Sequence, residues 1–370
     1  MTGLRPITRQ ATNTLALAKY PGAQPHWVAD MGFATPDPIL SAVRERIEEG
    51  HFSYPNIPRS VYKSIQQWCI KQYDWGIREE WIVIVPNTIS GVRISIKSTC
   101  PHGTIAVQSP NYGKLLNLSK GFNFTQWAIA LTENSKPFTT SDLGQIRRTR
   151  PSAIILCNPT NPTGIVSTRE ELERLAFNIK DLDTVVISDE AHADIILGDC
   201  RHIPAGSIKG LENKSITLLS PSKTFNLAGI SVGYAVIPST TIREKFKETQ
   251  AFFATGINAL GLVALESAYF NCSNWLQSLL QQLKINQNII QTTLRHTSLN
   301  YSPSEATYLA WIDTRAADGN VFANLLQAGV AVSDGHEFGS PGWIRFNFAC
   351  PQDQLATATS TFLDLFRSIK

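Results

Sequence analysis

The sequence predicts an α/β protein, with a mostly parallel central sheet sandwiched by helices and a second, smaller α+β domain. Short apolar runs recur through the middle of the chain and have the composition of strands buried on both faces. Amphipathic stretches lie among these runs, as in a parallel sheet whose strands are joined by helices. Near the C-terminus the pattern changes to helices followed by two further strands, which indicates the second domain.

Strands are predicted where a short apolar run is bounded by polar or turn-forming residues. Helices are predicted at 167–180, 276–296 and 318–328. In the first helix Ser167 or Thr168 is the expected cap, and two glutamates follow in the first turn, where a negative charge is favourable. The predicted strands are WIVIV (81–85), TIAVQ (104–108), SAIILC (152–157), TVVIS (184–188), SITLL (215–219), VGYAVI (232–237), ATYLAWID (306–313) and WIRFNFA (343–349).

Composition and charge exclude several classes of protein. The chain has 370 residues, of which 43% are apolar, so it can bury a large core. Its net charge is only +3 and its 33 basic residues are scattered, which argues against nucleic acid as a partner. No apolar run approaches the roughly 20 residues that span a bilayer, and the start, MTGLRPITRQATNT, lacks a signal-peptide core. We expect a soluble, cytoplasmic protein that does not bind membranes.

The cysteines and histidines do not form a metal site or a disulfide scaffold. In DEAHAD (189–194), His192 has no second histidine at ligand spacing, and HEFG (336–339) is a similarly weak metal signal. No metal is therefore expected. The cysteines lie far apart without a C-x-x-C pair, so we expect them to be reduced and structural. They are Cys69, Cys100, Cys157, Cys200, Cys272 and Cys350.

A single lysine in SPSKTFNLAG (220–229) is the most informative charged residue of the chain. Between Lys214 and Arg243, Lys223 is the only charged side chain, and apolar strands flank it. We therefore expect Lys223 to be buried, and burial penalises the charged form of an amine. A lone lysine between strands is more often a surface residue whose head reaches water, so Lys223 needs support from other motifs.

Polar residues follow four predicted strands, at the sheet edge where open α/β proteins bind ligands. Taken singly, each motif has an ordinary structural explanation as a turn, a helix cap or a packing residue. Their order and joint placement favour one binding site. The residues are Tyr112 in SPNYG (109–113), Asn161 in the rigid turn NPTNPTG (158–164), Asp189 in DEAHAD, and Lys223 with the hydroxyls of Ser220 and Ser222.

Pyridoxal phosphate requires this set of groups. Its aldehyde needs an amine, its ring nitrogen an anion, its phenolic oxygen a donor and its ring face an aromatic side chain. Lys223, Asp189, Asn161 and Tyr112 are the respective candidates. The phosphate suits a helix N-terminus with hydroxyl groups, which the turn PNTISG (86–91) provides through Thr88 and the backbone amides around Ile89, and to which Ser220 could add.

With these motifs the chain resembles the fold-type I pyridoxal-phosphate enzymes of the class I/II aminotransferase superfamily. Within that superfamily it is most similar to the MalY/PatB group of cystathionine β-lyase-like C–S lyases. The resemblance runs from Trp27 to Gln352 and rests on WVADM, NPTNPTG, SDEAHAD, SPSKTFNLAG, EATYLAWID and RFNFACP, in the same order. It implies a large cofactor-binding domain over residues 45–270, and a small domain formed by residues 1–44 and 271–370.

The resemblance also implies a role for each cofactor-binding candidate. Lys223 would bond the cofactor covalently, Asp189 would pair with its pyridinium nitrogen, and Asn161 would donate to its phenolate oxygen. Tyr112 would stack on the ring. His192 falls where many relatives have a tyrosine near the phenolate oxygen.

Two further roles follow from the same resemblance. Arg345 matches the arginine that grips the α-carboxylate of an amino-acid substrate. Its setting agrees, because Trp343, Arg345 and Asn347 share one face of the predicted strand. Tyr54, in HFSYP, matches a tyrosine that crosses a dimer interface, which implies a homodimer with composite active sites.

The chain departs from the family pattern at three positions. WVADMDF reads WVADMGF, so Gly32 removes a carboxylate close to where the substrate is expected to enter. Ser231 stands where many aminotransferases have a phosphate-binding arginine, which C–S lyases of this branch usually lack. ACPR reads ACPQ, with Gln352. The second departure favours the lyase branch, and the other two leave the substrate open.

The preferred function is therefore β-elimination on a cysteine S-conjugate such as cystathionine. Transamination between an amino acid and a 2-oxo acid uses the same residues and stays open as the alternative. A pyridoxal-phosphate-binding regulatory protein is less favoured, because the lysine, the aspartate and the substrate arginine are all present. A Rossmann-like dehydrogenase would need G-x-G-x-x-G after an early strand, and the chain has none.

Overall fold

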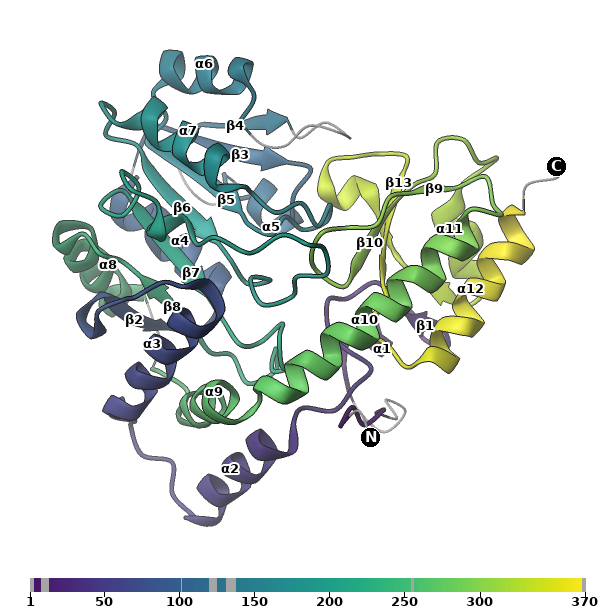
Figure 1. Ribbon diagram of the computed structural model, residues 1–370, viewed down its shortest axis with the longest axis horizontal. Helices are drawn as coiled ribbons and strands as arrows, with labels where there is room; N and C mark the ends of the chain where they lie inside the picture. The colour runs from purple at the N-terminus through teal and green to yellow at the C-terminus, as the bar shows by residue number, and fades with distance from the viewer. Residues whose placement is uncertain are drawn as a thin grey trace.

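The computed structural model describes residues 3–7, 13–100, 102–119, 125–130, 138–253 and 256–367. A seven-stranded sheet forms its centre, at the left of Figure 1. Neighbouring strands run parallel except at β8, which is antiparallel to both of its neighbours. The predicted α/β class with a mostly parallel sheet is confirmed. The strand order is β2 (Ile82–Val85), β8 (Gly233–Val236), β7 (Ser215–Leu219), β6 (Val185–Asp189), β5 (Ala153–Cys157), β3 (Thr104–Ser109) and β4 (Thr125–Ala130).

Helices cover both faces of this sheet because alternate side chains of its buried strands point in opposite directions. On β5, Ile155 belongs to an apolar cluster with α4 and α8, whereas Ile154 and Leu156 belong to a cluster with α6 and α7. Side chains of β2 and β8 also pack against α3 and α9. The bounds are α3 (Arg59–Tyr73), α4 (Thr88–Thr99), α6 (Thr140–Thr149), α7 (Arg169–Ile179), α8 (Thr240–Phe253) and α9 (Ala259–Asn271).

A second, four-stranded sheet lies on the right of Figure 1 and is antiparallel throughout. The long helix α10 (Ser273–Leu294) runs from α9 to this part of the molecule and contacts α12 and β9. The strand order is β12 (Ser333–Asp334), β13 (Trp343–Asn347), β10 (Leu309–Asp313) and β9 (Asn300–Tyr301), with α11 (Val321–Gln327) and α12 (Gln352–Phe366) beside it. The division into domains 1–44 with 271–370 and 45–270 stays a prediction.

The remaining elements are short or join the two sheets. Strand β1 pairs in parallel with β11, so the N-terminal segment lies at the end of the molecule that holds the second sheet. None of the helices among the described residues is long and apolar enough to cross a membrane. The bounds are α1 (Leu15–Ala18), β1 (Gln24–Pro25), α2 (Asp37–Glu48), η2 (Glu79–Trp81), α5 (Gly113–Leu116), η3 (Ala205–Ser207), β11 (Val330–Ala331) and η4 (Gly335–Phe338).

Several elements differ from their prediction in extent. Thr168, rather than Ser167, caps α7, and it forms a reciprocal capping box with Glu171. Helix α11 starts at Val321 instead of 318, because Asn320 caps it by accepting from the backbone amide of Ala323. The edge strand β4 was not predicted. None of the six cysteines, all of which lie among the described residues, forms a disulfide.

Candidate active site

A cavity of about 780 Å3 lies at the carboxyl ends of the parallel strands. Parallel strands bring the residues that follow them to one edge of a sheet, so distant motifs meet there. Of the predicted site residues, only Tyr54 does not line the cavity, and its side chain is fully exposed. The others line it together: Thr88, Ile89, Tyr112, Asn161, Asp189, His192, Ser220, Ser222, Lys223 and Arg345.

Lys223 follows β7 and reaches the middle of this lining. Its Nζ donates a hydrogen bond to the Ala29 carbonyl at 2.6 Å. The residue is half-buried, not fully buried as predicted, because its side chain faces the cavity. Burial and the nearby Arg345 guanidinium lower its pKa to about 8. An appreciable fraction of neutral amine is therefore present near neutral pH, as covalent chemistry at an aldehyde requires.

Asp189 ends β6 and is buried at the bottom of the site. Burial raises the pKa of its carboxyl to about 6, while hydrogen bonds from the Ala191 amide and the Thr88 hydroxyl, and the charge of Lys223, act in the opposite direction. A buried carboxylate with a raised pKa gains from a cationic partner. The ring nitrogen of pyridoxal phosphate is such a partner.

Arg345 lies on β13 and enters the site from the second sheet. Its Nη1 donates to Asn161 Oδ1 at 2.9 Å, and its Nη2 donates to the Trp27 carbonyl at 2.5 Å and to Ser333 Oγ at 3.2 Å. The guanidinium stacks over the Phe338 ring, with its carbon 4.6 Å from the ring centroid. Because Asn161 accepts through Oδ1, its Nδ2 amide group is left to donate toward the cavity.

The electrostatics of Arg345 suit a clamp for a carboxylate. Burial lowers its pKa to about 10, so the guanidinium stays charged near neutral pH. Its Nε is buried and has no hydrogen-bond partner among the described residues. Asn347, on the same face of β13, donates to the carbonyls of Val28 and Asp30 at 2.6 Å each. The predicted face of this strand is thus shared by an arginine that lines the cavity and an asparagine that holds the neighbouring segment.

His192 is buried and faces the cavity. Its Nδ1 has no hydrogen-bond partner among the described residues, and its ring lies edge-on to Tyr308 at 5.9 Å between centroids. Burial, with the charges of Lys223 and Arg345, lowers its pKa to about 3, so the imidazole is neutral. A neutral, buried ring with one unpartnered nitrogen fits a polar group of a bound ligand.

The N-terminus of α4 forms the other end of the cavity. Asn87 caps the helix by accepting from the Ser90 amide at 2.8 Å, and Thr88, Ile89 and Ser90 line the cavity. Gly91 brings the helix close to the sheet, because a Cβ at this position would lie 2.3 Å from Leu218 Cδ2. Such a helix N-terminus suits an anion.

Hydroxyl groups and one further cation complete that end of the cavity. The Ser220 and Ser222 hydroxyls are 2.8 Å apart, and Ser231, with a positive φ of 50°, also lines the cavity. Arg93 of α4 is a basic residue of the cavity lining. The residues present therefore fit the phosphate, the ring nitrogen and the aldehyde of pyridoxal phosphate.

Gly32 does not lie where the sequence suggested. It is buried outside the cavity lining, and its amide donates to the Ala349 carbonyl at 2.7 Å. A Cβ at Gly32 would lie 2.9 Å from Pro351 Cδ and 3.2 Å from Cys350 Cα. The expected position at the substrate entrance is thus wrong, since this residue packs against the start of α12.

Sequence reasoning missed several residues that shape the site. Phe338, whose ring lies under the Arg345 guanidinium, belongs to HEFG (336–339), a motif that the sequence marks only as a weak metal signal. Ser333 bridges Arg345 and the Trp27 carbonyl, to which its hydroxyl donates at 2.8 Å. No local pattern marks either residue, because their partners are distant in the chain. The described residues contain no cluster of three or more metal-ligating side chains.

A lysine and an aspartate facing one cavity, at the carboxyl edge of a seven-stranded and mostly parallel sheet, define the fold-type I architecture. The chain belongs to the aminotransferase class I and II family, which matches residues 36–362. It is 29% identical to cystathionine β-lyase PatB of Bacillus subtilis (strain 168), over 94% of this chain and 92% of that protein.

Solved structures agree with this membership. The crystal structure of OvoB superposes with a TM-score of 0.93 and 28% identity, over 99% of both chains. The pyridoxal-phosphate-bound C–S lyase of Staphylococcus hominis superposes with a TM-score of 0.88 and 26% identity, over 96% of this chain and 97% of that one. The predicted fold-type I fold and the predicted superfamily are both confirmed.

Proposed function

We propose that this protein is a pyridoxal-phosphate-dependent C–S lyase that carries out β-elimination on a cysteine S-conjugate such as cystathionine. The observation that carries the proposal is the cavity that joins Lys223, Asp189 and Arg345, in a chain similar over 94% of its length to a cystathionine β-lyase. Ser231 at the cavity wall supports the lyase branch, because many aminotransferases have a phosphate-binding arginine there.

The site residues divide the work of elimination among them. When bound, pyridoxal phosphate supplies the electron sink for the carbanion formed at the substrate α-carbon. Arg345 binds the α-carboxylate and orients the substrate. Lys223 removes the α-proton at its Nζ, for which a pKa of about 8 is well suited. Asp189 holds the ring nitrogen protonated. The thiolate then leaves from the β-carbon, and hydrolysis of the remaining enamine gives pyruvate and ammonia.

Transamination is the second candidate, and the family to which the chain belongs includes it by name. The same residues would act up to removal of the α-proton, after which Lys223 would return the proton to the cofactor and a 2-oxo acid would be needed to complete the cycle. Elimination needs no second substrate. The requirement for a 2-oxo acid therefore separates the two functions.

The test is an assay of purified protein with L-cystathionine, S-alkyl cysteines and ordinary amino acids, each with and without a 2-oxo acid. We expect thiol, pyruvate and ammonia to be released over many turnovers from a cysteine S-conjugate alone. Lys223→Ala is the matched control and should abolish this release. Activity that appears only when a 2-oxo acid is added would replace the lyase by the aminotransferase.

We further propose that the protein acts in the cytoplasm as a homodimer with composite active sites. Tyr54 supports this arrangement, because it is fully exposed and lies outside the cavity of its own chain. In a dimer, its phenol would complete the cofactor site of the partner subunit. The phosphate end of the cavity is the place where such a hydroxyl would be useful.

A further inference from the structure

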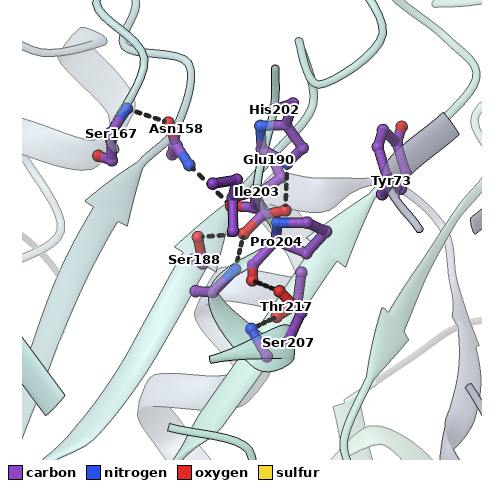
Figure 2. A network of polar contacts seen from close by, with 12 residues as sticks. Tyr73, Asn158, Ser167, Ser188, Glu190, His202, Ile203, Pro204, Ser207 and Thr217 are labelled. Carbon is purple, nitrogen blue, oxygen red and sulfur yellow. Dashed lines mark hydrogen bonds and ion pairs between the residues drawn. The ribbon is translucent and has the colours of Figure 1, made fainter. Parts of the chain in front are cut away.

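Glu190 directly follows Asp189 but points away from the cavity. Side chains alternate along a strand, so the two neighbouring carboxylates leave β6 on opposite sides. Ser188 lies on the same side as Glu190 and donates from its hydroxyl to Glu190 Oε1 at 2.7 Å. Figure 2 shows Glu190 between Ser188 and His202, with dashed lines to both.

The carboxylate of Glu190 is buried and fully engaged. Its Oε1 accepts from Ser188 and from the Ala205 amide at 2.9 Å, and its Oε2 is 2.7 Å from His202 Nε2. The Glu190 side chain has no exposed area and that of His202 has 1%. The Ser188 hydroxyl and the Ala205 amide act as donors, and His202 Nε2 donates when it carries a proton.

His202 is positioned as a partner of Glu190. Its Nε2 contacts the carboxylate, whereas its Nδ1 is buried and has no hydrogen-bond partner among the described residues. The Tyr73 ring lies edge-on to the imidazole at 5.2 Å, and the adjacent Ile203 carbonyl accepts from Asn158 Nδ2 at 3.3 Å. The segment that carries His202 is thus held against the end of β5, as Figure 2 shows.

Other ionisable groups surround this network. Burial raises the pKa of Asp194, an effect that His202 opposes. Burial also raises the pKa of the Cys69 and Cys157 thiols, and Glu190 adds to this effect. On the cavity side Asp189 feels Lys223, which opposes the effect of Glu190. Glu190 is therefore a fixed negative charge one residue behind the carboxylate that serves the cofactor ring.

We propose that Glu190 is a positioning residue that acts through Asp189: its buried negative charge, held by Ser188, Ala205 and His202, keeps a proton on the ring nitrogen that Asp189 contacts. The inference rests on the proposed cofactor, and it holds for a lyase and for an aminotransferase alike. The reaction assay tests the proposed function. The role of Glu190 is tested by a titration that measures no turnover, so the two can fail independently.

The experiment loads the full chain with pyridoxal phosphate labelled with 15N in the ring, and follows the ring-nitrogen chemical shift against pH. Glu190→Gln should lower the pH at which the nitrogen loses its proton by roughly half a unit to one unit, as expected for removal of a charge at this range in a protein interior. In the cofactor-free chain, labelled with 13C at aspartate carboxyls, the same variant should lower the pKa of Asp189.

His202→Gln is the matched control, because the glutamine amide still donates to Glu190 and leaves its charge in place. It should titrate close to the wild type. The double variant E190Q/H202Q places two amides opposite each other. It should lower the pH at which the ring nitrogen loses its proton as much as E190Q does. It keeps the test available if the single variant does not fold. Unchanged titration in a folded E190Q or double variant would overturn the proposal. A clear rise in H202Q would also overturn it, by showing that His202 carries a compensating positive charge.

Discussion

Burial shifts the ionisable groups of this site toward their neutral forms. The pKa of Lys223 falls to about 8 and that of His192 to about 3, while that of Asp189 rises to about 6. An amine that is easily deprotonated suits proton transfer at the substrate α-carbon. An aspartate whose charged form is disfavoured by burial gains from a cationic partner, which a protonated ring nitrogen provides. The same low polarity therefore serves both groups.

The first prediction concerns Asp189 in the cofactor-free chain. Its folded pKa of about 6 exceeds its ordinary value of 3.8, so the folded state binds the proton more tightly and loses stability as pH rises between these values. Asp189→Asn should remove this loss. Without cofactor we expect the variant to be more stable than the wild type by about 2–3 kcal/mol above pH 6, with the difference closing near pH 4.

Urea unfolding of both cofactor-free proteins across this pH range measures the effect. With cofactor bound, the order should reverse, because the neutral amide no longer offers the ring nitrogen an anion. A variant that is less stable than the wild type at every pH, with and without cofactor, would refute the assignment of an unpaired buried charge to Asp189.

The second prediction concerns Arg345. Its planar guanidinium contacts Asn161, Ser333 and the Trp27 carbonyl, and a lysine cannot reproduce that fork. Arg345→Lys should raise KM for the amino acid about tenfold or more, because substrate carboxylate binding weakens. Arg315→Lys, at an exposed arginine paired with Asp313, is the control and should leave KM unchanged. Unaltered KM in Arg345→Lys would move the carboxylate site elsewhere.

At the scale of elements, helix α4 shapes the end of the cavity that we propose for the phosphate. Its first residues line the cavity, and it packs closely on β7 because residue 91 has no side chain. The helix N-terminus can serve an anion only if this distance from the sheet is kept. A side chain at position 91 should therefore affect both stability and cofactor binding.

The third prediction compares two glycines in helices. In Gly91→Ala the new Cβ meets Leu218 Cδ2 at 2.3 Å, so α4 or Leu218 must shift; we expect a loss of about 1–3 kcal/mol and weaker pyridoxal-phosphate binding. In Gly144→Ala, on α6, the nearest atom is Arg148 Nη1 at 3.4 Å, on a flexible side chain. This variant should be neutral or up to about 1 kcal/mol more stable. Equal effects of the two substitutions on cofactor affinity would contradict the role of α4.

At the scale of the whole molecule, the segment from Trp27 to Met31 joins the two halves of the site. Its carbonyls accept from Arg345 and Asn347 of the second sheet and from Lys223 of the first, and the Met31 amide donates to Asn226 Oδ1 at 3.1 Å. The N-terminal part of the chain thus sets the position of Lys223 relative to Arg345.

The fourth prediction tests the composite dimer. Tyr54→Ala and Lys223→Ala should each abolish most activity as pure proteins. Mixed and reassociated, they should recover up to about a quarter of wild-type activity, because half of the dimers are hybrids with one intact site, as shared sites in a two-fold dimer require. A different affinity tag on each variant, with successive purification on both tags, would confirm that hybrid dimers formed. No recovery in verified hybrids would place Tyr54 outside the partner subunit's site.

Much of this architecture could be predicted from local sequence. Each buried strand is a short apolar run, and Thr168 with Glu171 marks the start of α7, because these signals depend on neighbours in the chain. Strand β4 escaped prediction because TQWAIA mixes polar and apolar residues at the sheet edge. The residues after the strands could also be foreseen as a site, since parallel strands bring their carboxyl ends together.

The sequence by itself determined the types of element, the family and the set of chemical groups at the site, because each is encoded in residue type and spacing. Only the tertiary structure decided what surrounds them. Arg345 meets Asn161 from 184 residues away, Gly32 packs on Cys350 instead of the cavity, and Glu190 is held by His202 behind Asp189. Burial and charge at a site are sums over such distant neighbours, so the pKa values and hydrogen-bond partners appear only when the chain is folded.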